Sequence, residues 1–195
     1  MIIGGKDVTQ IQPGKRGVAM VFQNYAIYPT MSVRENIEFG LKNNRVPKEK
    51  RSQLVAEVSE KVGLTEYLDR QPGTLSGGQR QRAWIAMVLA QETAIMLLDE
   101  PTTWLDISHQ IDLLELLSEL NREKGYTLAA VLHDLNQACR YATHLIALRD
   151  GRIVAEGAPK EIVTADLIER IYGLRCTIIE DPVAHTPLVV PLGRR

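Results

Sequence analysis

The sequence is poor in cysteine and aromatic residues and has no long apolar run. Two cysteines among 195 residues cannot form the framework of a small disulfide-stabilised domain. We therefore interpret Cys139 and Cys176 as partly buried apolar residues of a protein in a reducing compartment. The longest unbroken apolar run, 83–90, is far shorter than the roughly 18 residues that a membrane-spanning helix requires. The N-terminus lacks the pattern of a signal peptide, so we expect a cytoplasmic protein.

The remaining composition, 45% apolar and 24% charged, is typical of one globular domain or of a domain with a small inserted subdomain. The net charge of −1 conceals an asymmetry between two parts of the chain. Residues 1–82 carry 13 Lys and Arg against 8 Asp and Glu, whereas residues 83–195 carry 10 against 16. The basic residues are interspersed with acidic ones, as on solvated helix faces, so we expect no nucleic-acid partner.

Short apolar runs alternate with helix-like patterns along the chain. The runs at 18–22, 95–98 and 127–132 predict buried strands, and the run at 95–98 is expected to be a central one. This alternation predicts an α/β fold with a mostly parallel sheet that helices cover on both faces.

Start and stop signals outline the helices and hairpins. A capping box of Ser32 and Glu35 is predicted for the first helix, and Asp106 or Ser108 is the expected cap of a long amphipathic one. Helices are expected at about 33–41, 47–63, 77–90 and from 107 onward, with a hairpin around 150–151 and short β runs after 177.

Polar side chains follow the predicted strands: Gln23 the first, Asp99 and Glu100 the second, and His133 the third. Ligands of parallel sheets bind beyond the carboxyl ends of the strands, so we expect these side chains to gather at one edge. Two carboxylates at a strand end could hold Mg²⁺ and orient or deprotonate water, as phosphoryl transfer requires. A solvated strand edge is the alternative interpretation.

Glycines at a helix start are a second indication of nucleotide chemistry. Gly77 and Gly78, which follow Ser76, would let a helix N-terminus approach a phosphate closely. A plain Gly-Gly turn is the alternative, but the full string at 75–82, Leu-Ser-Gly-Gly-Gln-Arg-Gln-Arg, makes it the weaker one.

These strings resemble the motifs of ATP-binding cassette (ABC) ATPases. Residues 75–79 resemble the signature motif, 95–100 the Walker B strand and 104–106 the D-loop, while His133 resembles the switch histidine and Gln23 the Q-loop. All five occur in the family order. The resemblance implies a RecA-like P-loop NTPase core with an inserted helical subdomain. It assigns 1–25 to a remnant of the core, 26–83 to the helical subdomain, 84–175 to the rest of the core and 176–195 to a C-terminal tail.

The resemblance also implies a role for each matching residue. Asp99 would hold Mg²⁺, and Glu100 would act as general base or position the attacking water. His133 would contact the γ-phosphate. Gln23 would sense Mg²⁺ or the water and transmit its state to the helical subdomain.

The signature residues are implied to act across a dimer. Ser76, Gly77, Gly78 and Gln79 would bind ATP that a second cassette holds, and Asp106 would cross the dimer interface. The other three histidines match no motif and are interpreted as structural or exposed: His109, His144 and His185.

The family's phosphate loop, G-x-x-x-x-G-K-[ST] (Walker A), does not occur in the 195 residues. The closest imitation, at 13–16, has Arg16 where a hydroxyl belongs, and the upstream aromatic residue that stacks on adenine is also missing. We therefore expect the chain to begin after the first strands of the domain and to have lost most of its own affinity for ATP.

The two parts of the chain resemble different importer ATPases. Residues 1–82 resemble those for sugars and glycerol phosphate, and residues 83–195 resemble those for ferric siderophores. Both kinds share the string at 75–82, which suggests a recombination junction there. The second part is longer and contains Glu100, so the leading hypothesis is an iron(III)-siderophore importer ATPase, with a sugar or glycerol-phosphate importer as the alternative.

The resemblance implies ATP and Mg²⁺ as cofactors and a peripheral location on the cytoplasmic face of the inner membrane. The implied partners are a second ABC ATPase domain, in a homodimer or heterodimer, membrane permease subunits and, indirectly, a periplasmic or surface binding protein. A non-hydrolytic fragment that only lends its signature motif to an intact partner is a further alternative. ABC proteins of DNA repair are disfavoured, because only 51 residues separate Gln23 from Leu75 and they contain no heptads; those of translation carry two cassettes.

Overall fold

The computed structural model describes residues 1–21, 27–103 and 105–193. Gln23 and Trp104, two positions of the expected motifs, lie outside the described residues. The chain divides into two compact units, Met1–Val131 and Leu132–Arg195. None of the described helices has both the length and the apolarity that a bilayer crossing demands.

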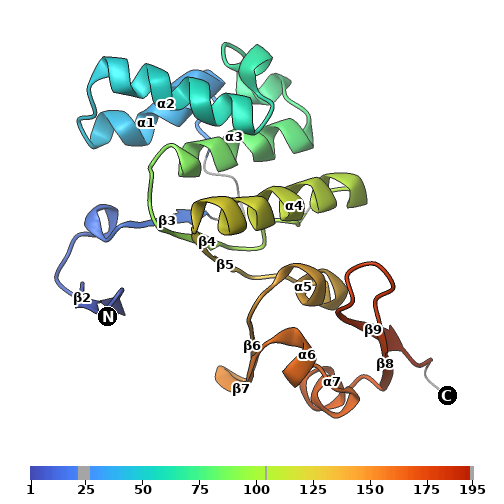
Figure 1. The fold of residues 1–195 in the computed structure, drawn as a ribbon. Helices are drawn as coiled ribbons and strands as arrows, with labels where there is room; N and C mark the ends of the chain where they lie inside the picture. Colours follow the sequence, from blue (N-terminus) through green and yellow to red (C-terminus); the bar gives the residue numbers. More distant parts are fainter. Residues whose placement is uncertain (22–26, 104, 194–195) are drawn as a thin grey trace. The chain divides into compact units, whose positions relative to one another are not determined.

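A three-stranded parallel sheet forms the centre of the first unit (Figure 1). Its strands are β3 (Val18–Val21), β4 (Ile95–Leu98) and β5 (Thr127–Ala130), and β4 lies between the other two, as predicted. In the register of the sheet, Met96 of β4 pairs with Ala19 of β3 on one side and with Leu128 of β5 on the other. The next residues along the three strands, 20, 97 and 129, pair in the same way. β5 is shorter than the apolar run that predicted it, although the N–H of Val131 still donates to the carbonyl of Leu98 at 2.9 Å.

The two faces of this sheet differ in burial. Ala19, Met96 and Leu98 are buried in one apolar core together with side chains of α3 (Gly77–Leu89) and α4 (Ile107–Lys124). On the opposite face, Met20 is 50% exposed and Leu97 is 36% exposed. The expectation that helices cover both faces is therefore wrong for the described residues, because the apolar sides of α3 and α4 pack on the same face.

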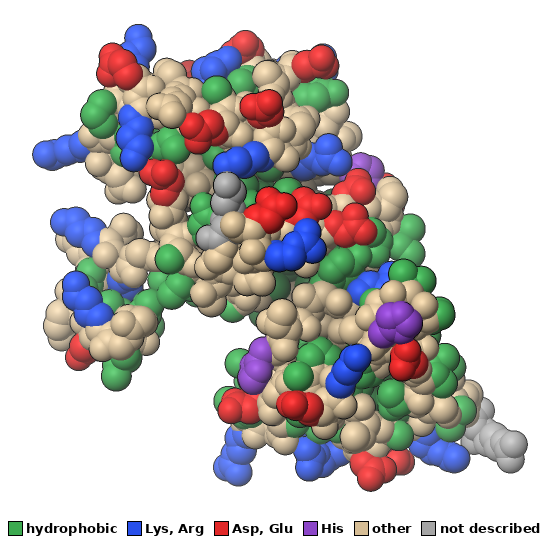
Figure 2. Space-filling model, in the orientation of Figure 1, with side chains coloured by type: hydrophobic (Ala, Val, Ile, Leu, Met, Phe, Trp, Pro, Cys, Tyr) green, Lys and Arg blue, Asp and Glu red, His purple; other side chains and the backbone are tan. Residues whose placement is uncertain are grey.

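Three helices of the first unit pack against one another: α1 (Val33–Asn43), α2 (Lys48–Lys61) and α3 (Figure 1). The predicted capping box is confirmed, because the Ser32 hydroxyl accepts from the N–H of Glu35 and the Glu35 carboxylate accepts from the N–H of Ser32. α2 follows Pro47, and Gly63 adopts a left-handed φ of +65° after its end. Figure 2 shows acidic and basic side chains intermixed on the visible face of these helices.

Asn36 anchors the loop before α1 from inside the helix. Its side chain is fully buried, accepts from the N–H of Tyr28 at 2.7 Å and donates to the carbonyls of Tyr28, Met31 and Ser32. The rest of the unit consists of short elements: β1 (Ile2–Ile3) and β2 (Lys6–Asp7), an antiparallel pair, and the 3-10 turns η1 (Pro13–Lys15), η2 (Thr65–Tyr67) and η3 (Pro72–Thr74).

The second unit contains two antiparallel hairpins and three short helices. The first hairpin, β6 (Leu145–Arg149) and β7 (Arg152–Gly157), turns at the predicted Asp-Gly pair. The second, β8 (Cys176–Glu180) and β9 (Pro187–Pro191), corresponds to the β runs expected near the C-terminus. The helices are α5 (Leu135–Tyr141), α6 (Pro159–Ile162) and α7 (Ala165–Tyr172).

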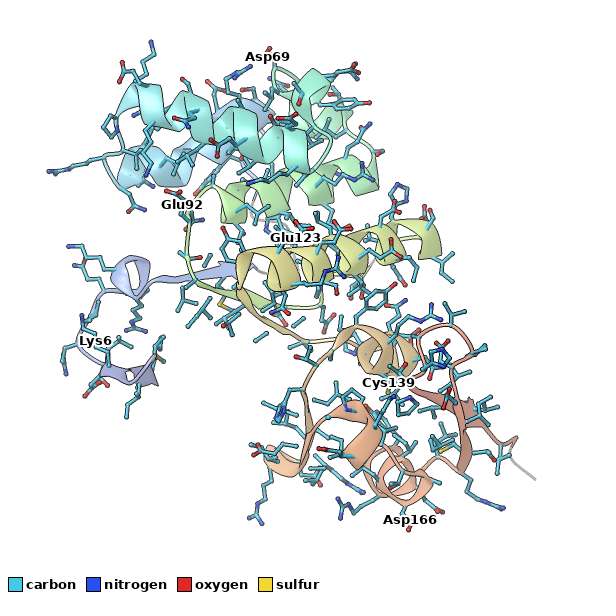
Figure 3. All side chains as sticks on the ribbon, viewed as in Figure 1. Lys6, Asp69, Glu92, Glu123, Cys139 and Asp166 are labelled. Atoms are coloured by element: carbon cyan, nitrogen blue, oxygen red, sulfur yellow. The ribbon has the colours of Figure 1, made fainter. Side chains whose placement is uncertain are left out.

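Both cysteines lie in the apolar core of the second unit (Figure 3 labels Cys139 on α5). Cys139 and Cys176 are free thiols and are buried, as the sequence predicted. Desolvation raises the pKa of both thiols above the ordinary value. Their environment is that of inert apolar residues rather than of reactive nucleophiles.

An ion pair fastens the second hairpin to α5. The guanidinium of Arg140 donates to the carboxylate of Asp181 at 2.6 and 3.0 Å, and the side chain of Asp181 is almost fully buried. The backbone N–H groups of Val183 and Ala184 donate to the same carboxylate and, together with Arg140, lower its pKa.

Candidate functional site

Two carboxylates extend the central strand beyond its carboxyl end. Asp99 and Glu100 follow β4 directly and are half-buried. Glu100 has a φ of +50°, a left-handed conformation that is uncommon for a residue with a side chain. Thr103 supports it twice: its hydroxyl donates to the Glu100 carboxylate at 3.1 Å, and its N–H donates to the Glu100 carbonyl at 3.2 Å. A strained position held in this way is typical of functional sites.

Two glutamines hold the loop that follows these carboxylates. Gln81, a buried residue of α3, donates from its amide to the carbonyl of Pro101. Gln110 of α4 donates to the carbonyls of Thr102 at 3.2 Å and Leu105 at 3.1 Å. The loop between the carboxylates and Asp106 is therefore fixed by both helices. Neither glutamine was predicted from the sequence, because Gln81 stands in the polar run 79–82, ahead of the apolar run 83–90, and carries no local sign of burial.

The Ser-Gly-Gly turn forms the N-terminus of α3. The Ser76 hydroxyl accepts from the N–H of Gln79 at 3.2 Å, and the Gln79 side chain accepts from the N–H of Ser76 at 3.0 Å. The first N–H groups of an α-helix have no acceptor within the helix. Because the capping box uses those of Ser76 and Gln79, the N–H groups of Gly77 and Gly78 are left for an anion, which the helix dipole also favours.

The two glycines have different surroundings. Gly77 is exposed, and a Cβ added there would meet no atom within 4 Å, so a ligand can approach the backbone. Gly78 is buried, and a Cβ added there would overlap Cδ2 of the His109 ring. Open approach to the backbone is therefore available at Gly77, whereas the missing side chain of Gly78 makes room for His109.

Asp106 is the N-cap of α4. Its carboxylate accepts from the N–H of His109 at 3.0 Å and from the Ser108 hydroxyl at 2.9 Å, and it lies 2.6 Å from Nδ1 of His109. These hydrogen bonds, chiefly those from His109, lower the pKa of Asp106 to about 2. Of the two expected caps, Asp106 and Ser108, the structure has Asp106. The contacts of His109 were not predicted, because the residue matches no motif. Its i, i+3 spacing from an expected cap was the signal that could have identified it.

Two other expected site residues, Gln23 and His133, are not placed beside Asp99 and Glu100. Gln23 lies outside the described residues. His133 is exposed and belongs to the second unit, three residues beyond β5. The gathering of Gln23, Asp99, Glu100 and His133 along one edge therefore stays a prediction. His144 and His185 are exposed, as predicted, and Nδ1 of His185 lies 2.7 Å from the Glu180 carboxylate.

The carboxylates at the end of β4 are oxygen ligands of the kind that hard divalent cations bind. Within the described part of the chain, no group of three or more His, Cys, Asp or Glu side chains could hold a metal ion. Mg²⁺ does not require such a cage, because it is commonly bound by one or two carboxylates together with water and phosphate oxygens. Asp99 and Glu100 fit that mode of binding.

Comparison with known proteins accounts for this combination of motifs. A family model described as "ABC transporter" matches residues 1–103. The chain belongs to the ABC transporter family. Its fold is the RecA-like α/β fold of ABC ATPases, a family that binds and hydrolyses ATP. The cassette MJ0796, solved as a dimer in a post-hydrolysis state bound to ADP and Pi, matches with a TM-score of 0.70 and 31% identity over 80% of this chain and 71% of that one.

Curated relatives of this ABC chain include both kinds of importer that the sequence resembles. The ferric enterobactin transport ATP-binding protein FepC of Escherichia coli (strain K12) is 82% identical over 142 residues, which are 73% of this chain and 52% of the relative. The oligosaccharides import ATP-binding protein MsmX of Bacillus subtilis (strain 168) is 39% identical over 160 residues, which are 82% of this chain and 44% of the relative. The chain thus spans about half the length of these relatives.

Proposed function

We propose that this ABC chain serves an importer of iron(III)-siderophores as its ATP-binding subunit, peripheral to the cytoplasmic face of the inner membrane. The 82% identity to the ferric enterobactin transport protein supports this substrate class over the oligosaccharide class, for which the identity is 39%. Import would require membrane permease subunits and, indirectly, a periplasmic or surface binding protein. Residues 26–83 would form the helical subdomain between 1–25 and 84–175 of the ATPase core, and 176–195 would form a tail.

Within that assembly, we assign the chain's motifs to ATP held between two cassettes. Asp99 would hold Mg²⁺, which neutralises phosphate charge when bound, and Glu100 would position the attacking water or accept its proton. Gln23 and His133 would face the metal or the γ-phosphate from other parts of the same chain. The half-burial of Asp99 and Glu100 and the supported left-handed backbone of Glu100 are consistent with these roles.

The observation that carries the proposal is the geometry of the turn at Ser76. Its capping box leaves the N–H groups of Gly77 and Gly78 free of intrahelical acceptors, and the space beside Gly77 is open. Two such N–H groups at the positive end of a 13-residue helix suit a terminal phosphate. Asp106 would face the partner cassette from the adjacent end of α4.

A second mode of action follows from the phosphate-loop pattern that the 195 residues do not contain. A chain of these residues would bind ATP weakly by itself and would lend its signature turn to ATP held by an intact cassette. We propose this lending as the activity that the 195-residue chain itself can perform.

A mixing experiment tests the lending. The chain is added to an intact siderophore-type cassette whose own signature serine has been changed to arginine, so that its phosphate loop binds ATP but its signature is defective. We expect ATP hydrolysis to rise with added chain and to saturate, and the Ser76→Arg chain to give no rise. Equal stimulation by the Ser76→Arg chain would refute the proposal.

A binding measurement separates the two modes of action. Calorimetric titration of the chain alone with Mg²⁺ and ATP should show no binding in the micromolar range. Micromolar binding, with turnover by the chain alone, would instead favour a complete ATPase site within these residues.

A further inference from the structure

We propose that His109 is a positioning residue that sets the distance between the D-loop carboxylate of Asp106 and the signature glycine Gly78. The proposal rests on the proposed function, because it concerns the N-terminal ends of α3 and α4, which would face the ATP held by a partner cassette. His109 matches no motif of the sequence analysis, and its role is inferred from its contacts alone.

The imidazole of His109 bridges the first turns of two helices. One edge of the ring places Nδ1 at 2.6 Å from the carboxylate oxygen of Asp106, the residue that caps α4. The other edge lies against Gly78 in the first turn of α3, so closely that a Cβ at Gly78 would overlap Cδ2 and lie 2.5 Å from Nε2. The ring therefore occupies the space that any side chain at position 78 would need.

The protonation of the ring follows from its partner. The low pKa of Asp106, about 2, keeps the carboxylate ionised at neutral pH, and a carboxylate can only accept hydrogen bonds. The Nδ1 atom of His109 must then carry a proton. In the neutral ring the proton is thereby fixed on Nδ1, and Nε2, on the edge toward Gly78, is left without one.

A fixed distance between the Asp106 carboxylate and the backbone of Gly78 matters for the activity proposed above. The N–H groups of Gly77 and Gly78 would bind a phosphate, and Asp106 would reach the same partner cassette. A displacement of about 1 Å in such a site can cost on the order of 100-fold in rate. A planar ring bonded at one edge and packed at the other fixes both points more firmly than packing or a hydrogen bond alone.

Three substitutions of His109 separate the two contacts. His109→Asn keeps a donor near the position of Nδ1 but removes the ring edge from Gly78. His109→Phe keeps a ring against Gly78 but removes the donor. His109→Ala removes both. Asp112→Asn is the matched control, because Asp112 lies one turn further along α4 and its carboxylate pairs with Arg82 at 3.4 Å, beyond the first turn of α3.

The first readout is NMR spectroscopy of the chain itself, which does not depend on ATP or on a partner. We expect the ¹⁵N shifts of His109 to report a protonated Nδ1 and an unprotonated Nε2, and Asp106→Ala to move the proton toward Nε2. The amide signal of Gly78 should shift in the Asn, Phe and Ala variants but not in Asp112→Asn. A wild-type ring protonated only on Nε2, or an unmoved Gly78 signal in His109→Ala, would overturn the proposal.

The second readout is the stimulation of the signature-defective cassette. We expect the Asn, Phe and Ala variants each to lower the maximal rate by about 10- to 100-fold, with Asp112→Asn close to wild type. Full stimulation by His109→Asn or by His109→Phe would show that one contact suffices and would overturn the proposal. If the wild-type chain does not stimulate, the proposed function fails, and the NMR measurements still decide whether His109 sets the spacing.

Discussion

Replacing Gly78 with alanine should destabilise the first unit, because the new methyl group would overlap the His109 ring. Forcing one extra carbon into a packed site typically costs about 1–3 kcal/mol. Alanine is favoured over glycine in a helix by about 0.5–1 kcal/mol, which offsets part of that cost. We therefore expect a net loss of about 1–2 kcal/mol in the free energy of unfolding.

The neighbouring glycine is the control for this prediction. Gly77→Ala adds the same methyl group one residue earlier, where it would meet no atom within 4 Å. It should leave the stability unchanged or raise it by up to about 0.5 kcal/mol. The double variant Gly78→Ala, His109→Ala has no ring for the new methyl group to overlap. Its loss in the free energy of unfolding should therefore be at least about 1 kcal/mol smaller than the sum of the losses in the two single variants.

Urea unfolding followed by tryptophan fluorescence measures these differences in the right part of the molecule. Trp84 is buried in the core of the first unit, and the sequence of the second unit, 132–195, contains no tryptophan. With a slope of about 2 kcal/mol per molar urea, within the usual range of about 1–3, the expected loss should shift the midpoint of Gly78→Ala by about 0.5–1 M. Equal midpoints for Gly77→Ala and Gly78→Ala would show that the ring does not occupy this position.

Three further predictions concern other parts of the molecule. Asn36→Ala should destabilise the first unit by about 2–4 kcal/mol, measured by the same unfolding assay, because it removes a fully buried side chain that bonds the N–H of Tyr28 and several carbonyls. The pKa of Asp181 is lowered from 3.8 in the folded state, so its stabilising contribution is present above that value and is lost as the pH falls through the lower folded value. The protection factors of the β8 and β9 amides, that is, their exchange rates relative to those of an unfolded chain at the same pH, should therefore fall in acid. Asp181→Asn should lower these protection factors at neutral pH and flatten their acid dependence. Cys139 and Cys176 are buried thiols with raised pKa values, so both should react with a thiol reagent much more slowly in the native chain than in urea, and equal rates would contradict the described core.

Features that depend on neighbours in sequence could be predicted well. The capping box of Ser32 and Glu35 involves residues three apart, and the structure has it as expected. The central position of β4 was predicted from a run that is apolar at every position, and the structure places this strand between β3 and β5. The hairpin at the Asp-Gly pair followed from local turn chemistry.

Features that depend on contacts between distant elements could not be predicted. The overlap of His109 with Gly78 joins residues of two different helices, and nothing in the string at 75–82 distinguishes the open glycine from the filled one. The same is true of Gln81, whose amide reaches the loop after β4. The exposed sheet face at Met20 and Leu97 was also missed, since an apolar strand indicates burial on both sides and does not say which elements supply it.

The central claim is that the turn at Ser76 binds ATP held by another cassette. The most direct measurement is the composition of the complex formed when the chain is mixed with an intact, hydrolysis-deficient siderophore-type cassette, Mg²⁺ and ATP. Analytical ultracentrifugation with labelled nucleotide should find a one-to-one complex that contains one ATP, forms only with nucleotide and is abolished by Ser76→Arg. A complex that forms without ATP, or that tolerates Ser76→Arg, would contradict the claim.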